Sequence, residues 1–131
     1  MKRAWLIGLC FLSQVAVGKD LSSSDATNAI VGEAAGEPYA VKLGVACAIR
    51  NRGSLRGVYG FQSPVTRHSS LSVWNDAARA WRESANPHVV SPARTANHFG
   101  SAADVRKGTF RGMTLLCVLG TGKHATYFFR P

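Results

Sequence analysis

The sequence has few acidic residues: seven aspartates and glutamates stand against sixteen lysines and arginines, which gives the 131-residue chain a formal net charge of +9. A charge of this size predicts an anionic partner or an anionic surface as the target. Against this background Glu33 and Glu37 are notable, because they lie four residues apart beside the helix-breaking residues Gly36 and Pro38.

The sequence also lacks a hydrophobic run long enough to span a bilayer, which needs about twenty apolar residues. The apolar run at residues 4–12 is roughly half that length, follows Lys2 and Arg3, and precedes the small residues Ala16 and Gly18. This pattern is typical of a cleavable export signal, and we assign residues 1–18 to it. We therefore expect a periplasmic or extracellular protein without stable membrane insertion.

Cleavage after the signal would leave residues 19–131, enough for one compact domain with a single core. Loss of Lys2 and Arg3 would lower the net charge from +9 to +7. The arginines are spread along the chain, and outside the cytoplasm an anionic cell-wall polymer is a better partner than nucleic acid. A basic surface that only aids solubility is the alternative, and nothing in the sequence indicates an oligomeric state.

Cysteine is scarce as well, because only Cys47 and Cys117 follow residue 18. An even count in an exported protein permits one disulfide, while the apolar surroundings of both residues fit two buried free thiols. Neither cysteine belongs to a Cys-x-x-Cys motif, and the four histidines show no His-x-x-x-His spacing. We expect neither a metal site nor a cofactor.

The spacing of apolar residues predicts two helices in the first half of the domain. Serines and an aspartate can cap a first helix over about residues 24–35, which Gly36 and Pro38 then end. Pro38 suits the first position of a second helix, and Gly53 suits its C-cap. The polar end of this helix, at residues 50–52, should lie in solvent or in a groove.

The next segment, residues 53–70, is rich in glycine and proline and predicts an irregular surface loop. Ser72 can cap a third helix that continues through Ser84. Trp74 and Trp81 share one face of this helix, which favours a role in the core over a role as sugar-binding platforms.

The end of the chain predicts a small sheet. Residues 95–99 form a short extended piece, and residues 112–119 and 124–129 form two strands around a glycine turn. With helices first and strands last, the fold class is α+β and mainly helical, with a short C-terminal antiparallel hairpin.

Glu33 is the best candidate for chemistry. It follows Ile30, Val31 and Gly32 at the end of the first helix, where a carboxyl group half-buried against apolar neighbours would have a raised pKa and could act as a general acid. An ordinary exposed glutamate near a helix end is the alternative. Glu37 has a structural role available, because the dipole at the start of the second helix favours an acid.

Two further functions stay open at this point. Cys47 with His98 or His124 could form the Cys-His pair of a wall peptidase, although Cys47 lies about nine residues into its helix, where the N-terminal dipole has faded. A cationic protein that binds the cell wall without cleaving it is the other possibility.

Several stretches resemble the SleB-type cell wall hydrolases. Ile30-Val-Gly-Glu-Ala-Ala-Gly-Glu-Pro-Tyr39 is similar to the family pattern Tyr-Gly-Glu-Ala-x-Gly-Glu-Pro-Tyr, and Val45-Ala-Cys-Ala-Ile-Arg-Asn-Arg52 to its apolar helix ending in Asn-Arg. Ala96-Asn-His-Phe99 resembles the family's Ala-Thr-His-Tyr segment, and residues 112–130 resemble its closing hairpin. The loop at residues 53–70 departs from the family because it lacks an aromatic-rich continuation.

The resemblance implies a small lysozyme-like domain that cuts the glycan strand of peptidoglycan, with Glu33 as the catalytic acid. It favours a lytic transglycosylase, in which one carboxyl group protonates the glycosidic oxygen and then removes a proton from the muramic 6-hydroxyl. Hydrolysis would need a second carboxylate about 5 to 9 Å away. The residues expected to contact substrate are Glu37, Tyr59, Gln62, Asn97, His98 and His124.

Overall fold

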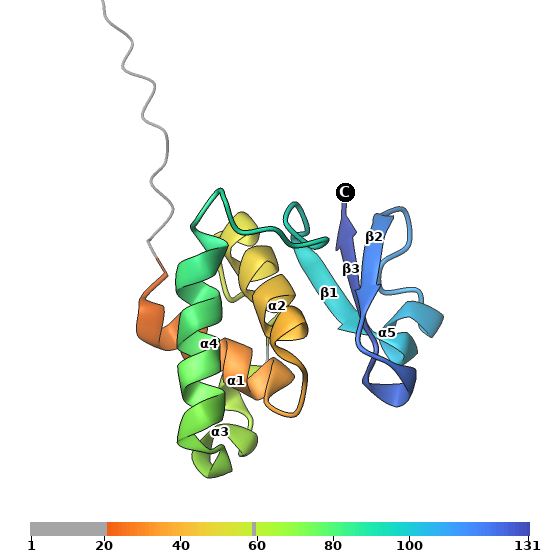
Figure 1. Cartoon of the computed structure of the whole chain (residues 1–131). Helices are drawn as coiled ribbons and strands as arrows, with labels where there is room; N and C mark the ends of the chain where they lie inside the picture. Colours follow the sequence, from red (N-terminus) through yellow and green to blue (C-terminus); the bar gives the residue numbers. More distant parts are fainter. Residues whose placement is uncertain (1–20, 59) are drawn as a thin grey trace, which may run out of the picture.

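The computed structural model describes residues 21–58 and 60–131 of the chain (Figure 1). The proposed export signal at residues 1–18 lies outside the described residues, and so does Tyr59. Within the described ranges, no helix combines the length and the apolar character needed to cross a membrane.

The fold is α+β, as the sequence predicts, with a group of helices on one side and a small sheet on the other (Figure 1). Three longer helices pack together, and their bounds are α1 (Ser23–Ala34), α2 (Tyr39–Arg52) and α4 (Leu71–Ser84). Helix α2 lies between the other helices and the sheet, which explains why all of residues 41–49 are buried.

The predicted ends of α1 and α2 agree with the structure to within one residue. Ser22 caps α1 by accepting a hydrogen bond from the Asp25 backbone N–H at 3.1 Å. Pro38 directly precedes α2, and Gly53 ends it with φ of 71°, a left-handed conformation that glycine adopts without a Cβ penalty. These ends were predictable because each depends on a local cap.

Two predictions in the middle of the chain are wrong. Helix α4 is capped by Ser70, which accepts from the Val73 N–H, and Ser72 lies inside its first turn. The segment 53–70 is not wholly irregular, since it contains a 3₁₀ turn, η1 (Gly60–Gln62), and a short helix, α3 (Val65–His68). As predicted, Trp81 of α4 lies in the hydrophobic core of the domain, and Trp74 of the same helix packs against that core.

The sheet has three antiparallel strands in the order β1-β3-β2, with bounds β1 (His98–Ser101), β2 (Thr114–Leu119) and β3 (Thr126–Arg130). The predicted hairpin is β2 and β3, joined through a second 3₁₀ turn, η2 (Gly122–His124). Of the predicted extended piece at residues 95–99, only His98 and Phe99 belong to a strand, β1, which pairs with the edge of β3 opposite β2. A short helix, α5 (Ala102–Arg106), follows β1 and was not predicted.

The helices meet the sheet at Phe128, a fully buried residue of β3. A Cβ atom at Gly44 of α2 would come within 2.6 Å of the Phe128 ring, so glycine is needed at this point of the helix. Cys47 of α2 lies in the hydrophobic core, and Cys117 of β2 is partly buried. Both are free thiols, but only Cys47 is buried as the second alternative expected.

Replacing Phe128 by alanine should lower the free energy of unfolding by about 3 to 5 kcal/mol, because it opens a cavity between α2 and the sheet. Chemical denaturation followed by circular dichroism measures this loss. Val90→Ala is the control, since Val90 is 91% exposed and its truncation should change stability by less than about 0.5 kcal/mol. Equal effects of the two substitutions would contradict this view of the core.

Candidate functional site

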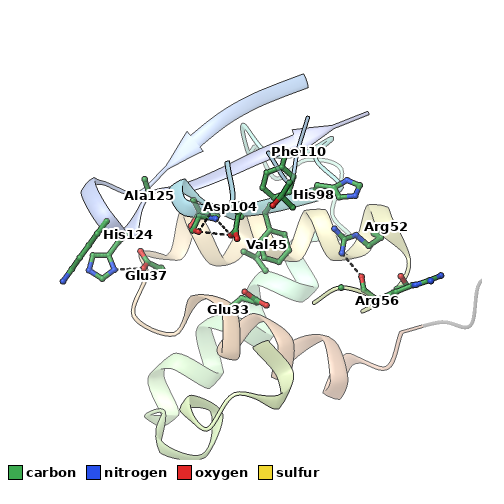
Figure 2. Close-up of a pocket in the computed structure, with 18 residues that line it drawn as sticks. Glu33, Glu37, Val45, Arg52, Arg56, His98, Asp104, Phe110, His124 and Ala125 are labelled. Atoms are coloured by element: carbon green, nitrogen blue, oxygen red, sulfur yellow. Dashed lines mark hydrogen bonds and ion pairs between the residues drawn. The ribbon is translucent and has the colours of Figure 1, made fainter. Parts of the chain in front are cut away.

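A cleft of about 720 Å³ lies between the helices and the sheet (Figure 2). The helical side contributes Glu33, Glu37 and Val45, and the opposite side contributes residues of β1, α5 and the η2 turn. Its ionisable side chains are Glu33, Glu37, Arg52, Arg56, His98, Asp104, Lys123 and His124. A volume of this size is typical of binding sites for small ligands.

Glu33 projects from the last turn of α1 into this cleft (Figure 2). Its Oε1 accepts a hydrogen bond from the Gly60 backbone N–H at 2.8 Å. The expectation that Glu33 is half-buried against apolar neighbours is wrong: the residue is exposed, while Ile30 and Val31 face the core. The carboxyl group is therefore oriented by the hydrogen bond from the Gly60 N–H and not by the apolar packing that the sequence predicted.

The backbones of Gly32 and Gly60 are in direct contact. A Cβ atom at Gly32 would lie 1.6 Å from the Gly60 carbonyl oxygen, and a Cβ atom at Gly60 would lie 2.6 Å from the Glu33 Cγ. Neither position has room for any side chain. Because both residues are glycine, the η1 turn approaches α1 closely enough for its N–H to reach the Glu33 carboxyl group.

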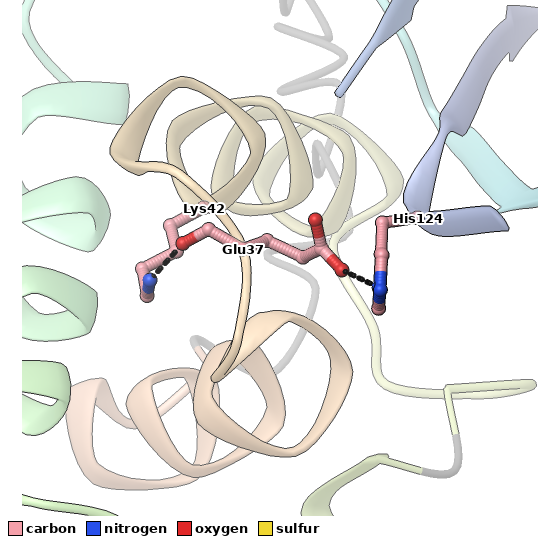
Figure 3. A network of polar contacts seen from close by, with 3 residues as sticks. All are labelled: Glu37, Lys42 and His124. Carbon is pink, nitrogen blue, oxygen red and sulfur yellow. Dashed lines mark hydrogen bonds and ion pairs between the residues drawn. The ribbon is translucent and has the colours of Figure 1, made fainter. Parts of the chain in front are cut away.

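Glu37 lies at one end of the cleft, between the helices and the hairpin. Its Oε1 is 3.1 Å from Nδ1 of His124 in the η2 turn, and its backbone carbonyl accepts a hydrogen bond from the buried Lys42 ammonium (Figure 3). The Glu37 side chain is 15% exposed, whereas that of His124 is 62% exposed. Glu37 therefore connects the turn before α2 to the hairpin, a contact different from the interaction with the helix dipole expected for it.

Tyr39, the last residue of the Glu-Pro-Tyr motif, faces away from the cleft toward α4. Its hydroxyl group donates a hydrogen bond to Glu83, and the Arg79 guanidinium lies 3.8 Å from the centre of its ring. Burial, followed by the hydrogen bond to Glu83, raises the pKa of Tyr39 to about 12. Tyr39 thus holds the start of α2 against α4.

The polar end of α2 binds several segments of the chain. Arg50 donates to Ser84 Oγ at 2.8 Å and to the Trp81 carbonyl at 2.7 Å, with its guanidinium 3.7 Å from the centre of the Trp81 ring. Asn51 donates to two backbone carbonyls of residues 94–96, both at 2.7 Å. These bonds fix α4 and the segment before β1 relative to α2.

Arg52 emerges into the cleft, one of the two outcomes expected for this helix end. Its Nε donates to the Asn97 carbonyl at 3.0 Å, and its Nη1 donates to the Arg56 carbonyl at 2.9 Å. Burial lowers the pKa of the guanidinium, because desolvation disfavours its charged form. The two carbonyl groups hold the side chain in a fixed position.

His98 is the first residue of β1 and also lines the cleft. Its Nδ1 lies 2.7 Å from the Asn97 Oδ1. Burial and, to a smaller extent, the positive charge of Arg52 lower the pKa of the imidazole below its ordinary value. The neutral form of His98 is therefore favoured at neutral pH.

On the sheet side, Phe110 forms part of the wall and Asp104 lies at the start of α5. The Phe110 ring stacks on Phe129 with 4.4 Å between centroids. Asp104 accepts hydrogen bonds from the Ser101 backbone N–H at 2.9 Å and from its hydroxyl at 2.8 Å, and these bonds lower the pKa of the carboxyl group. The Ser-x-x-Asp spacing of this capping box could have been recognised in the sequence.

Four of the predicted site residues line the cleft together: Glu33, Glu37, His98 and His124. Asn97 supports His98 and Arg52 from the side without being part of the lining. Gln62 is exposed on the η1 turn and does not line the cleft. Tyr59 lies outside the described residues. Phe110 and Lys123 also line the cleft and were not predicted, because their positions depend on how the last third of the chain folds.

Cys47 is 2% exposed in the interior of α2, and burial raises the pKa of its thiol. A nucleophilic cysteine must be accessible to substrate and must be a thiolate at working pH. Burial of Cys47 blocks access, and its raised pKa disfavours the thiolate. His98 and His124 make their hydrogen bonds with Asn97 and Glu37. Within residues 21–58 and 60–131, no three His, Cys, Asp or Glu side chains gather as a metal site would require.

Gly32→Ala should destabilise the protein by at least about 2 kcal/mol, because the new methyl group collides with the Gly60 backbone. Thermal unfolding measures the effect. Gly36→Ala is a matched control, since a Cβ atom there would meet nothing within 4 Å. If Gly32→Ala were as stable as Gly36→Ala, the backbone contact would not be as close as described.

The pKa of His98 should lie below 6.5. Replacing Arg52 by glutamine should raise the pKa of His98, because it removes a nearby positive charge. NMR titration of the imidazole resonances measures both values. Because the folded state binds the proton less well than the unfolded state, stability should fall as the pH drops below about 6.5. His98→Gln should flatten this pH dependence below about pH 6.5, and a His98 pKa above 6.5 would contradict it.

Comparisons with protein-family models, with curated proteins and with solved structures find no significant match.

Proposed function

We propose that this protein cleaves the glycan strand of peptidoglycan between N-acetylmuramic acid and N-acetylglucosamine, with Glu33 as general acid and base. The observation that carries the proposal is the placement of Glu33 in the cleft with its carboxyl group oriented by the Gly60 N–H at 2.8 Å. Both glutamates of the Gly-Glu-Ala-x-Gly-Glu-Pro-Tyr motif, which resembles that of the SleB-type hydrolases, line this cleft.

In the proposed transglycosylase reaction, the protonated form of the Glu33 carboxyl group acts first. It transfers its proton to the glycosidic oxygen, the bond from the muramic anomeric carbon breaks, and the N-acetylglucosamine portion leaves as an alcohol. The resulting carboxylate then removes the proton from the muramic 6-hydroxyl, whose oxygen bonds to the anomeric carbon. The product has a 1,6-anhydro end, no water is consumed, and Glu33 regains its proton.

The other acids of the cleft favour this one-carboxyl mechanism over hydrolysis. Glu37 is paired with His124, and Asp104 is hydrogen-bonded to Ser101 at the start of α5. Hydrolysis requires a second carboxylate that can act on a water molecule or on the anomeric carbon. Both candidates already hold structural elements together, whereas no described side chain donates a hydrogen bond to Glu33.

The walls of the cleft also suit a sugar polymer. Phe99 and Phe110, both partly exposed, provide apolar surface against which the C–H faces of pyranose rings can pack. Basic residues lie at both ends: Arg52 and Arg56 at one (Figure 2), and at the other Lys123, which directly precedes His124 in the η2 turn. An exported location, inferred from residues 1–18, would bring such a cleft into contact with the cell wall.

Glu33→Gln should lower the cleavage rate by at least about 100-fold, because the amide cannot donate or accept the proton in either step. Digestion of purified peptidoglycan followed by mass spectrometry measures both rate and product. Products with 1,6-anhydro ends support transglycosylation, and reducing ends support hydrolysis. Asp76→Asn in α4 is the matched control, since Asp76 is not part of the cleft lining and the change should leave the rate intact.

The rival functions give different results in the same assay. Undiminished cleavage by Glu33→Gln would exclude Glu33 as the catalytic residue. Release of peptides that is blocked by thiol alkylation would indicate the Cys47 peptidase, which the burial of Cys47 opposes. Binding to peptidoglycan without release of any product would indicate a cationic wall-binding protein.

A further inference from the structure

One end of the cleft carries positive charge without an acidic partner. Arg52 and Arg56 lie there beside His98, away from the Glu37–His124 end (Figure 2). Among residues 21–58 and 60–131, Glu37 and His124 form the one contact between an acidic and a basic side chain within 4.0 Å, and it is an ion pair only when His124 is protonated. No described carboxylate therefore lies within that distance of either guanidinium group.

The hydrogen bonds of Arg52 leave most of its guanidinium group available. An arginine side chain has five N–H donors. The Nε–H binds the Asn97 carbonyl, and one N–H of Nη1 binds the Arg56 carbonyl. The other donors, including both on Nη2, have no acceptor among the described residues, although the side chain is half-buried. The planar fork is held rigidly and retains donors on both terminal nitrogens.

A fork of this kind matches the two oxygens of a carboxylate, which can accept two parallel hydrogen bonds from it. Since two backbone carbonyls already fix Arg52, little conformational entropy is lost when an anion binds. Burial lowers the pKa values of both Arg52 and His98, and the charge of Arg52 lowers that of His98 further. An arriving negative charge would offset both effects.

We propose that Arg52, assisted by the charge of Arg56, forms a subsite for a carboxylate carried by the muramic acid units of the glycan. The inference builds on the proposed function. Muramic acid differs from glucosamine by a lactyl ether, whose carboxyl group is free in bare glycan and linked to a peptide with its own carboxylates in intact peptidoglycan. By binding one sugar of each pair, the subsite fixes which glycosidic bond faces Glu33.

The first test varies the ligand and uses the full chain with Glu33→Gln, so that binding is measured without cleavage. Calorimetry compares bare glycan strands, the same strands after carbodiimide activation and borohydride reduction of their carboxyl groups, and neutral chitin oligosaccharides of equal length. Reduction should weaken binding about tenfold, equivalent to about 1.4 kcal/mol, to the level of chitin. Equal affinity for all three ligands would overturn the subsite.

A peptide-bearing glycan identifies the source of the carboxylate. If it binds more weakly than bare glycan, the lactyl carboxylate is the ligand, and if it binds more tightly, the peptide carboxylates are. Both outcomes support the subsite, provided that reduction of the carboxyl groups removes the preference.

The second test varies the protein. Arg52→Gln should abolish the preference for bare over reduced glycan, with thermal unfolding as the check that the variant is folded. Arg56→Glu, which leaves the bonds of Arg52 intact, should lower the preference at least threefold. Arg67→Glu on α3 is the matched control, because Arg67 is exposed and not part of the cleft lining, so the same charge change should leave the preference unaltered.

The outcomes separate this inference from the proposed function. Cleavage of peptidoglycan by the wild-type protein with no carboxylate preference would overturn the subsite and leave the function of Glu33 standing. A carboxylate preference that depends on Arg52 and Arg56, without any cleavage, would support the subsite and overturn the enzymatic proposal. A preference unchanged in a folded Arg52→Gln variant and in Arg56→Glu would overturn the assignment to these arginines.

Discussion

The close contact between the backbones of Gly32 and Gly60 is the constraint on which the cleft depends. It brings the η1 turn against the end of α1, and the Gly60 N–H then reaches the Glu33 carboxyl group. A side chain at either position would separate the two elements and release the carboxyl group from its donor. The glycine that precedes Glu33 in the motif therefore has a steric explanation, which links the sequence pattern directly to the orientation of the proposed catalytic group.

Helix α2 connects this contact to the rest of the molecule. Its middle, residues 41–49, is buried between the helices and the sheet, and its end binds α4, the segment before β1 and the loop after the helix. The same helix thus contributes its middle to the hydrophobic core and its last residue, Arg52, to one end of the cleft. Because carbonyl groups from two different segments position Arg52, the place of its positive charge in the cleft depends on the complete fold.

Features with local causes could be predicted from the sequence, and features with long-range causes could not. The ends of α1 and α2 follow from caps, and the hairpin of β2 and β3 follows from apolar runs around glycines. The exposure of Glu33 was misjudged because the direction of a side chain at a helix end depends on what packs there. Glu33 itself was identified from its motif, whereas the position of Arg52 beside Asn97 required the path of residues 53–97.

The central position of β3 also determines when the cleft can form during folding. Within the described residues, β1 and β2 each pair with β3 and not with each other, although β1 precedes β3 by more than twenty residues. Closing the loop between such distant strands costs entropy before any contact between them can compensate for it. Long-range pairings of this kind therefore form late. The helices can therefore pack first, and the wall bearing His98 and Phe99 is completed when β3 docks through Phe128. A chain interrupted before β3 would carry Glu33 but no cleft around it.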